Sequence, residues 1–517
     1  MHHSDAPGIP PVHTVPEAIA WWADATPDAP ALLDLHGGVI SYGQLQATSE
    51  AFARQVRALG IVAGDRIVLA LPSDMRSAVA ALAAIRVAVA APVNPAQPVA
   101  EAETILGAIR PRAVIVAERE VTPFRVAARR AGIRVLELDA AGALLTDAAD
   151  GVVSARHVPL PSPDAWALIL LTSGTTARPR LVPASHQALF ETCEERARIR
   201  RYTPGDRGLH SAPLHFVVGL SRIVEALIAG GSAIVATAAE IVDQPEAIRD
   251  LEPTWMWMGP PLLEAVLEAA REQPAFAEWP LRFVRAGGSQ VTPQLIARGE
   301  ALWGVPLLNG YGTTETMGYI SAEEDPERIP RKLGSVGQAR PGRDIAIRDA
   351  DGAVLPAAAT GEITVRGRAI FPGYLDDPEA TAAVFFPGGW YRTGDLGYLD
   401  EDGYLFVTGR TREMVNRGGE KIAPDDVDAV LRTHPAVAAA AAFALPDPHL
   451  GEDIAVAVVL REGWAPTPRA LRRWMLDRLT SHKVPRRIWF VTALPRTDSG
   501  KIQRNVLTER FRAHGDV

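Results

Sequence analysis

A strand that runs straight into a loop of hydroxyls, glycine and proline narrows the possible folds of this chain more than any other segment. Residues 166–171 are an apolar run of strand length, and residues 172–180 follow as Thr-Ser-Gly-Thr-Thr-Ala-Arg-Pro-Arg. Hydroxyl and backbone N–H donors at the end of a buried strand suit phosphate oxygens, and Pro179 stops the chain from continuing as a helix. We therefore expect a phosphate-binding loop, with contacts from Thr172, Ser173, Gly174, Thr175, Thr176 and Arg180.

Helical and strand patterns alternate on both sides of this loop. Apolar residues recur at helical spacing over Tyr42–Leu59, and an apolar run over Arg66–Leu71 is followed by a helical stretch over Met75–Ala90. Another short strand is expected over Ala113–Val116, whereas residues 172–183 are expected to be a loop. Strands separated by helices are typical of a parallel sheet covered by helices, so the expected fold class is α/β.

The pattern changes from about residue 333. Short strands are expected over Ile345–Arg348, Gly361–Arg366 and Tyr404–Thr408, with Asp-Gly turns at 351–352 and 402–403 that fit antiparallel hairpins. We place a domain boundary near 409–412. The remaining residues indicate a small α+β unit, with helices at about 425–433 and 467–480 and strands at about 439–444, 453–460 and 487–491.

Composition excludes several classes of function. The chain has 517 residues and a net charge of -8, which argues against nucleic acid as a partner, because phosphate backbones are bound by basic surfaces. One cysteine cannot build a disulfide framework. We find neither a signal peptide nor an apolar run of membrane-spanning length, so we expect no membrane span and a cytoplasmic location. The chain has four lysines, three of them in its last hundred residues: Lys332, Lys421, Lys483 and Lys501.

Four more motifs follow the loop along the chain. They are Gly310–Glu315 (Gly-Tyr-Gly-Thr-Thr-Glu), Tyr391–Asp395 (Tyr-Arg-Thr-Gly-Asp), Gly409–Glu413 (Gly-Arg-Thr-Arg-Glu) and Leu494–Lys501 (Leu-Pro-Arg-Thr-Asp-Ser-Gly-Lys). With the phosphate loop, they make the chain resemble the adenylate-forming superfamily of acyl-CoA synthetases, peptide-synthetase adenylation domains and firefly-type luciferases. Each motif alone is moderately specific, whereas five in the family's order are hard to obtain by chance.

The resemblance implies an enzyme of two domains. We expect a large N-terminal domain over residues 1–409, built from layered α/β sheets and a distorted β-barrel. A hinge is expected at 410–412, and a small mobile α+β domain over 413–517. In the family the small domain rotates about the hinge, so that one site serves two half-reactions in turn.

The resemblance also assigns a nucleotide site for ATP, or for an acyl-adenylate. Tyr311 would offer a flat face to adenine, Thr314 would donate to the α-phosphate, and Asp395 would accept from the ribose hydroxyls. Glu315 is a hard oxygen ligand suited to Mg²⁺, which bridges phosphate oxygens. Further nucleotide contacts are expected from Gly288, Ser289, Gln290, Asn309, Gly310, Gly312, Thr313 and Arg410.

Lys501 would carry the first half-reaction, in which the acid's carboxylate attacks the α-phosphorus of ATP. A lysine that reaches both groups can stabilise the developing charge and align the attack. Arg412 occupies the hinge position. After rotation, Gly418 and Gly419 would line a tunnel for the pantetheine arm of CoA, with Lys421 beside it, and the thiolate would displace AMP.

The thiol donor is expected to be CoA. Residues 414–424 and 481–485 most resemble acyl-CoA synthetases, including the oxalyl-CoA ligase branch. A carrier protein is the rival donor, but no fused carrier domain follows residue 501. The expected partners are therefore a small carboxylic acid and CoA.

The predicted acid pocket departs from the family. Relatives often have Pro-Leu-Phe-His before a glycine, whereas residues 213–219 here are Pro-Leu-His-Phe-Val-Val-Gly, which displaces the histidine by one position. Substrate contacts are expected from His215, Phe216, Gly219, Trp257, Gly287 and Gly318. No acid is placed to hold an α-amino group and no arginine to hold a second carboxylate, so an apolar acid is expected. Trp255 and Trp257 are each interpreted as either a pocket residue or a core residue.

The phosphate loop also departs from the family pattern, at Ala177, Arg180 and Leu181. Leu181 replaces a glycine beside a loop that must close over pyrophosphate. An alternative hypothesis is therefore a specialist that mainly performs the thioester step on an acyl-adenylate made by a separate adenylating enzyme. A stand-alone enzyme that loads a carrier protein is a second alternative, and a catalytically silent binding protein is a third, disfavoured because Lys501, Glu315 and Asp395 are all present.

Overall fold

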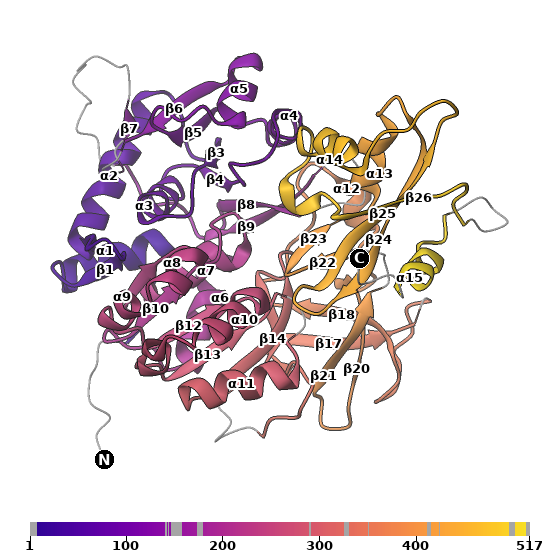
Figure 1. The fold of residues 1–517 in the computed structure, drawn as a ribbon. Helices are drawn as coiled ribbons and strands as arrows, with labels where there is room; N and C mark the ends of the chain where they lie inside the picture. The colour runs from indigo at the N-terminus through magenta and orange to yellow at the C-terminus, as the bar shows by residue number, and fades with distance from the viewer. Residues whose placement is uncertain are drawn as a thin grey trace.

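The computed structural model of the protein describes residues 8–139, 142, 144–145, 158–172, 179–288, 291–324, 330–349, 351–410, 415–422, 424–495 and 502–512. Four β-sheets and the helices that cover them make up most of these residues. Figure 1 shows the N-terminal elements, indigo to magenta, lying beside the orange and yellow C-terminal elements. No helix in the described part of the chain is long and apolar enough to cross a membrane.

The first sheet has seven strands in the order β7-β6-β5-β3-β4-β8-β9. The five central strands are parallel, whereas β7 and β9 run antiparallel at the edges. The strands are β3 (Arg66–Ala70), β4 (Val89–Pro92), β5 (Ala113–Ala117), β6 (Arg134–Leu138), β7 (Leu144–Leu145), β8 (Trp166–Thr172) and β9 (Arg180–Ser185).

The second sheet has nine strands in the order β16-β15-β14-β13-β12-β10-β11-β1-β2. Its parallel centre runs from β1 to β14, and β2, β15 and β16 are antiparallel. The strands are β1 (Pro30–Leu33), β2 (Val39–Ser41), β10 (Arg207–His210), β11 (Ser232–Val235), β12 (Trp255–Met258), β13 (Phe283–Ala286), β14 (Leu307–Thr313), β15 (Gly318–Ala322) and β16 (Gln338–Ala339).

Helices separate and cover these two sheets. Side chains alternate between the faces of a strand, so Ile67 and Leu69 of β3 join the core shared with the second sheet, while Val68 and Ala70 join a core on the outer face. The helices are α1 (Val15–Ala25), α2 (Tyr42–Ala58), α3 (Met75–Ala84), α4 (Val99–Ile109), α5 (Pro123–Arg130), α6 (His186–Ile199), α7 (Val217–Ile228), α8 (Ala238–Asp243), α9 (Pro245–Asp250), α10 (Pro260–Ala269), α11 (Pro293–Trp303) and the 3₁₀ turn η1 (Pro274–Glu278). Between the sheets, α3 is buried almost all round.

A third, antiparallel sheet connects the N-terminal sheets to the C-terminal unit. Its strands are β17 (Arg343–Arg348), β18 (Gly361–Gly367), β19 (Phe385–Phe386), β20 (Trp390–Leu399) and β21 (Leu405–Arg410), with the short helix α12 (Pro378–Ala382) between β18 and β19. The strands pair in the order β17-β18-β20-β19, and β21 also pairs with β20. The strands expected to form a distorted β-barrel therefore pair as an open sheet in the described residues.

The C-terminal unit is a mixed sheet with helices on both faces. Its elements are β22 (Val415–Arg417), β23 (Glu420–Ile422), α13 (Pro424–Arg432), β24 (Val437–Asp447), β25 (Gly451–Leu460), α14 (Pro468–Leu476), the 3₁₀ turn η2 (Ser481–Lys483), β26 (Arg487–Phe490) and α15 (Arg504–Arg512). The expected domain boundary at 410–412 stays a prediction, because residues 411–414 lie outside the described residues.

The α/β fold class, with a large N-terminal part and a smaller C-terminal part, is confirmed, but two local predictions are wrong. The helix expected over Met75–Ala90 ends at Ala84, and its last residues belong to β4. Short apolar runs do not distinguish a buried helix from a buried strand. The loop expected over 172–183 is also too long, because β9 begins at Arg180 and pairs with β8.

Candidate active site

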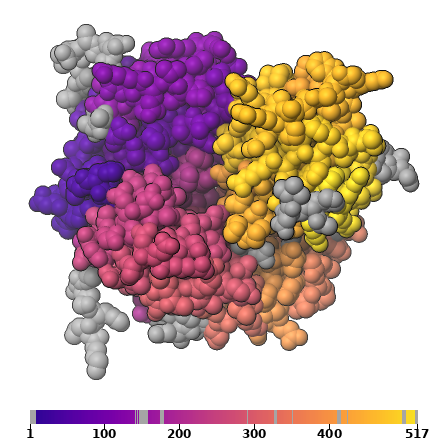
Figure 2. Space-filling model, viewed as in Figure 1, coloured from indigo at the N-terminus to yellow at the C-terminus, as the bar shows by residue number. Residues whose placement is uncertain are grey.

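A cavity of about 1760 Å³ lies between the N-terminal sheets and the C-terminal unit. Figure 2 shows the yellow C-terminal atoms packed against purple N-terminal atoms along this boundary. The walls combine the ends of β8, β13, β14 and β20 with the turn between β22 and β23, with α13, and with η2. Segments far apart in the sequence therefore meet in one place.

The turn after β14 carries the second motif. The hydroxyl of Thr316 is fully buried, donates to the carbonyl oxygen of Gly318 at 2.6 Å and accepts the backbone N–H of Thr313 at 2.9 Å. Gly312 passes so close to β15 that a Cβ would lie 1.9 Å from the carbonyl oxygen of Gly318. This tight turn places Thr314 and Glu315 on the cavity wall.

Glu315 is held by an aromatic hydroxyl that sequence reasoning missed. Tyr374 donates to its Oε1 at 3.0 Å, and burial together with this carboxylate raises the pKa of Tyr374, so the phenol stays a donor. Arg180 lies over the same ring, with its Cζ 5.0 Å from the ring centroid. Thr172 faces Arg180 across β8 and β9. The two ends of the phosphate loop thus lie beside the acid of the second motif.

Asp395 of the third motif is buried on β20 at the cavity wall. Its Oδ2 accepts the hydroxyl of Tyr311 at 2.6 Å, so the tyrosine predicted to face adenine is tied to the acid predicted to face ribose. Arg410 lies opposite Asp395 in the pairing of β20 with β21. Three predicted nucleotide contacts are therefore gathered at one edge of the cavity.

The acid end of the cavity is apolar and aromatic. His215, Phe216, Val217 and Val218 form one wall, and Trp257 on β12 and Tyr319 on β15 form another, beside Gly287, Gly288 and Gly318. The indole Nε1 of Trp257 donates to the hydroxyl of Tyr319 at 2.8 Å. Gly219 does not line the cavity; it lets α7 pack against the preceding loop, where a Cβ would lie 2.1 Å from the carbonyl oxygen of Pro213. Trp255 is a core residue, stacked on Tyr202.

A buried charge cluster lies behind Tyr319. Glu225 on α7 is fully buried and paired with Arg196, Arg222 and Arg285. Burial alone would raise the pKa of Glu225, but the three guanidinium groups bring it down to about 2. The Cζ atoms of Arg222 and Arg285 lie 5.1 and 5.2 Å from the centroid of the Tyr319 ring. Tyr319 lines the cavity and packs against two of these arginines, and none of the three arginines lines the cavity itself.

The C-terminal wall of the cavity is anchored to the N-terminal side. A Cβ on Gly418 would lie 2.9 Å from Cγ of Pro261, and one on Gly419 would lie 3.7 Å from the carbonyl oxygen of Gly288. Lys483 Nζ lies 2.7 Å from Glu101 Oε1 on α4 and 3.3 Å from Asp426 Oδ2 on α13. Burial alone would lower the pKa of Lys483, but these two carboxylates raise it, so the lysine stays charged.

Comparison with known proteins matches the chain to one family. The sequence model of the AMP-binding enzyme matches residues 19–375, and that of the AMP-binding enzyme C-terminal domain matches residues 426–501. The chain belongs to the AMP-binding enzyme family.

Curated relatives within the AMP-binding enzyme family are named as CoA ligases. The chain is 35% identical over 471 residues to the oxalate–CoA ligase of Arabidopsis thaliana, which covers 89% of this chain and 91% of the relative. It is 32% identical to the sulfoacetate–CoA ligase of Cupriavidus necator (95% and 96%) and 30% identical to a 4-chlorobenzoate–CoA ligase of Arthrobacter (97% and 96%). The predicted membership of the acyl-CoA ligase branch, and of the acid–thiol ligase class, is confirmed.

Solved structures of similar proteins share the whole fold. The amide bond synthetase McbA of Marinactinospora thermotolerans has a TM-score of 0.84 at 27% identity, covering 96% of this chain and 99% of that one. A double mutant of o-succinylbenzoate CoA synthetase from Bacillus subtilis, bound with a product analogue, has a TM-score of 0.82 at 25% identity (95% and 98%). A malonyl-CoA ligase bound with methylmalonyl-CoA and AMP has a TM-score of 0.77 at 28% identity (91% and 97%).

The structure brings most of the predicted site residues together, and part of the family's motif set lies outside its described residues. Cavity-lining residues among those predicted are Thr172, Arg180, His215, Phe216, Trp257, Gly287, Gly288, Gly312, Thr313, Thr314, Glu315, Gly318, Asp395, Gly418 and Gly419. Asn309, Gly310 and Tyr311 lie on β14 next to the cavity. For Arg410 and Lys421 only the strand position is described, and Ser173, Gly174, Thr175, Thr176, Ser289, Gln290, Arg412 and Lys501 lie outside the described residues.

Several cavity residues were missed by sequence reasoning because they belong to no motif of the resemblance that names a role. They include Tyr374, Tyr319, Arg417, Glu420 and His482. Glu420 lies two residues from the predicted tunnel glycine Gly418, and His482 precedes one of only four lysines. The scarcity of lysine and the resemblance of residues 481–485 to acyl-CoA synthetases both point to this segment, but neither assigns a role to His482.

Proposed function

We propose that the protein is an AMP-forming acyl-CoA ligase, which activates a carboxylic acid as an acyl-adenylate and transfers the acyl group to CoA. One observation carries the proposal. A single cavity joins the nucleotide motifs of the N-terminal part to the glycine turn Gly418–Gly419 of the C-terminal unit. A ligase that adenylates an acid and then thioesterifies it needs both in one place.

The described residues can position the adenylate. Asp395, already accepting from Tyr311, can accept a ribose hydroxyl, and Thr314 can donate to a phosphate oxygen at the turn after β14. Arg180 and Tyr374 put a guanidinium and a phenol hydroxyl beside Thr172, where the phosphate loop begins. Such fixed donors stabilise charge that develops on phosphate oxygens. Lys501 would add the catalytic ammonium in the first half-reaction.

Glu315 suits a magnesium ion that accompanies the nucleotide. Its carboxylate is buried at the cavity wall, and the Tyr374 hydroxyl occupies only one of its oxygens. Magnesium is commonly held by one or two carboxylates together with substrate phosphates. No group of three or more acid, histidine or cysteine side chains in the described residues forms a metal cage by itself. Bound there, the ion would neutralise phosphate charge, while Glu315 holds it in place.

The arrangement of the two parts supports the thioester step. In the described structure the turn Gly418–Gly419 lies against Gly288 and Pro261, where the resemblance expects the pantetheine tunnel. The TM-score is 0.82 to o-succinylbenzoate CoA synthetase bound with a product analogue and 0.77 to malonyl-CoA ligase with methylmalonyl-CoA and AMP bound. It is 0.70 and 0.69 to a relative from Rhodopseudomonas palustris with and without ATP. We infer that the C-terminal unit is positioned for transfer to CoA.

The acid is proposed to be a small apolar aryl or alkyl carboxylic acid. Its pocket is lined by Phe216, Val217, Val218, Trp257 and Tyr319, which supply apolar and aromatic surface. The guanidinium groups of Arg222 and Arg285 lie against the Tyr319 ring and are paired with Glu225, and neither arginine lines the cavity. They do not reach a second carboxylate in the pocket. We also propose that the enzyme acts in the cytoplasm.

The position of Leu181 weakens the argument that the altered phosphate loop raised against a two-step ligase. Leu181 is buried in the core on the outer face of the first sheet, and its side chain does not line the cavity. Its backbone carbonyl accepts the N–H of Leu375 at 2.9 Å. The Leu181 side chain is therefore accommodated in the core and not in the cavity. The specialist for the thioester step remains the second candidate.

The deciding experiment separates the half-reactions. Benzoate, 4-chlorobenzoate, hexanoate, oxalate and sulfoacetate would be tested for ATP–pyrophosphate exchange, and the synthetic adenylates of the first three acids would be offered to the enzyme with CoA. We expect exchange and thioester formation with an apolar acid. Thioester formation without exchange would establish the specialist and imply a separate adenylating enzyme. Transfer to a carrier protein but not to CoA would overturn the proposal, and activity on oxalate or sulfoacetate alone would overturn its acid class.

A further inference from the structure

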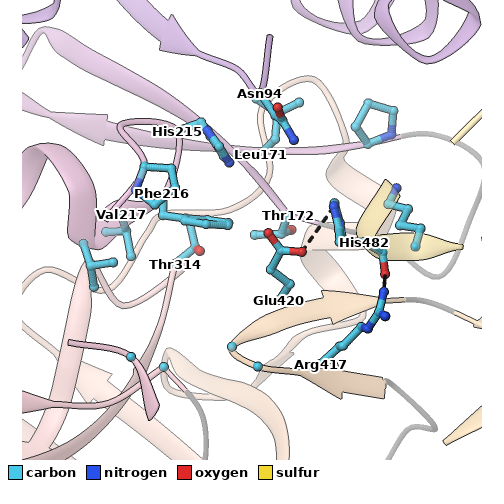
Figure 3. Close-up of a pocket in the computed structure, with 18 of the residues that line it drawn as sticks. Asn94, Leu171, Thr172, His215, Phe216, Val217, Thr314, Arg417, Glu420 and His482 are labelled. Carbon is cyan, nitrogen blue, oxygen red and sulfur yellow. Dashed lines mark hydrogen bonds and ion pairs between the residues drawn. The ribbon is translucent and has the colours of Figure 1, made fainter. Parts of the chain in front are cut away.

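A histidine–glutamate pair projects into the cavity from the C-terminal unit. His482 Nδ1 lies 3.2 Å from Glu420 Oε2. Figure 3 shows this pair facing His215 and Phe216 across the hollow, with Thr314 beside Phe216. Glu420 follows directly on the glycines of the proposed tunnel. The pair therefore lies where an incoming thiol would meet an acyl-adenylate.

The backbone that carries His482 is fixed from three sides. Arg417 Nη1 donates to the carbonyl oxygen of His482 at 2.6 Å, and Arg417 Nε lies 2.7 Å from Asp453 Oδ1. The next residue, Lys483, is paired with Asp426 in its own unit and with Glu101 across the boundary. This last contact exists only while the C-terminal unit is docked as described. Docking of the C-terminal unit therefore places His482 in the cavity and forms the proposed tunnel at the same time.

We propose that His482 is the general base that accepts the proton of the CoA thiol in the thioester step. This inference rests on the proposed function. Glu420 accepts Nδ1–H, which leaves the lone pair of Nε2 available to the cavity. As the sulfur bonds to the acyl carbon, its proton passes to Nε2. The bond from the acyl carbon to the phosphate oxygen breaks, AMP leaves with the electron pair, and the imidazolium later returns its proton to solvent.

The charges around His482 suit this role. Burial, reinforced by Lys483, His215 and Arg417, lowers its pKa to about 3, so the imidazole is neutral at physiological pH and can accept a proton. A thiol becomes strongly acidic only while its sulfur bonds to carbon, so transfer during the attack does not need a strong base. Glu420, on Nδ1, then stabilises the imidazolium that forms, as the carboxylate of a catalytic triad does.

His215 is the rival base and is less well placed. Its ring packs against Phe216 with centroids 4.4 Å apart, and burial lowers its pKa to about 4. Among the described residues no carboxylate lies within hydrogen-bond distance of its ring. Nothing would therefore fix its tautomer or stabilise its protonated form. We assign the proton transfer to His482.

The test compares His482→Gln with His215→Gln and with His449→Gln, a control on an exposed loop of the same unit. Single-turnover thioester formation would be followed from benzoyl-, 4-chlorobenzoyl- and hexanoyl-adenylate with CoA, between pH 6 and 9. We expect His482→Gln to be slower by about 100-fold at pH 7. Below the thiol pKa, its rate should rise about tenfold per pH unit, because it depends on preformed thiolate. The native rate should be much flatter.

A second nucleophile separates proton transfer from structural damage. Hydroxylamine is unprotonated near neutral pH, so hydroxamate formation from the same adenylates should fall less than threefold in His482→Gln. Equal loss with CoA and hydroxylamine, an unchanged pH slope, or the steep slope in His215→Gln instead would each overturn the assignment. If the native enzyme forms no thioester from any of the three adenylates, the proposed activity on an apolar acid fails, which is a different result from failure of the His482 assignment.

Discussion

At the scale of single residues, the buried carboxylate of Glu225 is the group on which we expect the stability of the fold to depend most. One acid on α7 holds three buried guanidinium groups, and two of these face the ring that closes the acid pocket. A buried ion pair contributes little against an apolar replacement, but removing one partner leaves uncompensated charge in the core. The cluster therefore links the stability of the N-terminal sheets to the shape of the pocket.

We predict that Glu225→Gln lowers the free energy of unfolding by about 3 to 5 kcal/mol. Urea unfolding at pH 7 would measure the loss, with Glu268→Gln, an exposed acid paired with Arg271, as the control. Because Glu225 is shifted from its ordinary pKa of 4.5 to about 2, its contribution is complete above pH 4.5 and is lost as the pH falls toward 2. The native–variant difference should shrink over that range. A difference of less than 1 kcal/mol at pH 7 would contradict the prediction.

At the scale of elements, two contacts dock the C-terminal unit. One is the turn between β22 and β23, where Gly418 has a φ of +59° and lies against Pro261. The other is the ion pair from Lys483, the last residue of η2, to Glu101 on α4. Both lie at the proposed CoA entrance, so changes in either should affect the thioester step more than adenylation.

Gly418→Ala should slow thioester formation from an acyl-adenylate by about tenfold or more, because a Cβ would lie 2.9 Å from Pro261 Cγ. Gly451→Ala is a matched control, since Gly451 also has a positive φ (+76°) but has open space around its missing Cβ. Both variants carry similar backbone strain. Equal rates in the two would show that the close contact with Pro261 is unimportant.

Glu101→Gln removes the N-terminal partner of Lys483. We expect thioester formation to fall about tenfold, with a smaller effect on pyrophosphate exchange, since a partly buried charge pair contributes about 1 to 2 kcal/mol. Glu103→Gln on the same helix serves as the comparison, because Glu103 is exposed and paired only with Arg130 in the described residues. Similar losses in both half-reactions would argue against a role in docking.

At the scale of the whole molecule, we propose that the C-terminal unit serves each half-reaction with a different face. The described arrangement presents Gly418, Glu420 and His482 to the cavity. The resemblance instead assigns Lys501 to the adenylation step. The two sets of residues should therefore be separable by mutation, which a single fixed active site would not allow.

Lys501→Ala should lower pyrophosphate exchange by at least about 100-fold, as expected for loss of a charge-stabilising donor in the transition state. Thioester formation from a synthetic acyl-adenylate should change far less. The two assays on one preparation, with native protein alongside, give the comparison directly. Loss of both activities would mean that the role of Lys501 has been assigned to the wrong step.

The sequence predicted those parts of the site that lie within short motifs. A role could be predicted from the sequence for residues that belong to a motif of the resemblance, namely Thr172, Thr314, Glu315 and Asp395. No role could be predicted for Tyr374, because the hydrogen bond that joins it to Glu315 spans 59 residues. The pair of Lys483 and Glu101 spans 382 residues. No periodicity or local pattern encodes such distances, which depend on how the sheets and the C-terminal unit pack.

Fold prediction failed where the local signal was ambiguous. Residues 78–92 are apolar apart from Arg86, so the end of α3 at Ala84 and the start of β4 at Val89 are set by packing between two sheets. Arg180 looked like a loop residue because it follows Pro179 and the hydroxyl-rich phosphate loop, yet its backbone pairs with Thr172. In both places tertiary contacts decide the boundary.

The hydrogen bond between Trp257 and Tyr319 restricts how the acid pocket can evolve. A smaller residue at position 257 would widen the pocket but leave the Tyr319 hydroxyl without its donor, against a ring that faces two buried guanidinium groups. Phe216, Val217 and Val218 also line the pocket, are only partly buried and lie where a loop enters α7. We therefore expect relatives that evolve to use other carboxylic acids as substrates to change residues 216–218 first. Trp257 and Tyr319 should be retained in them.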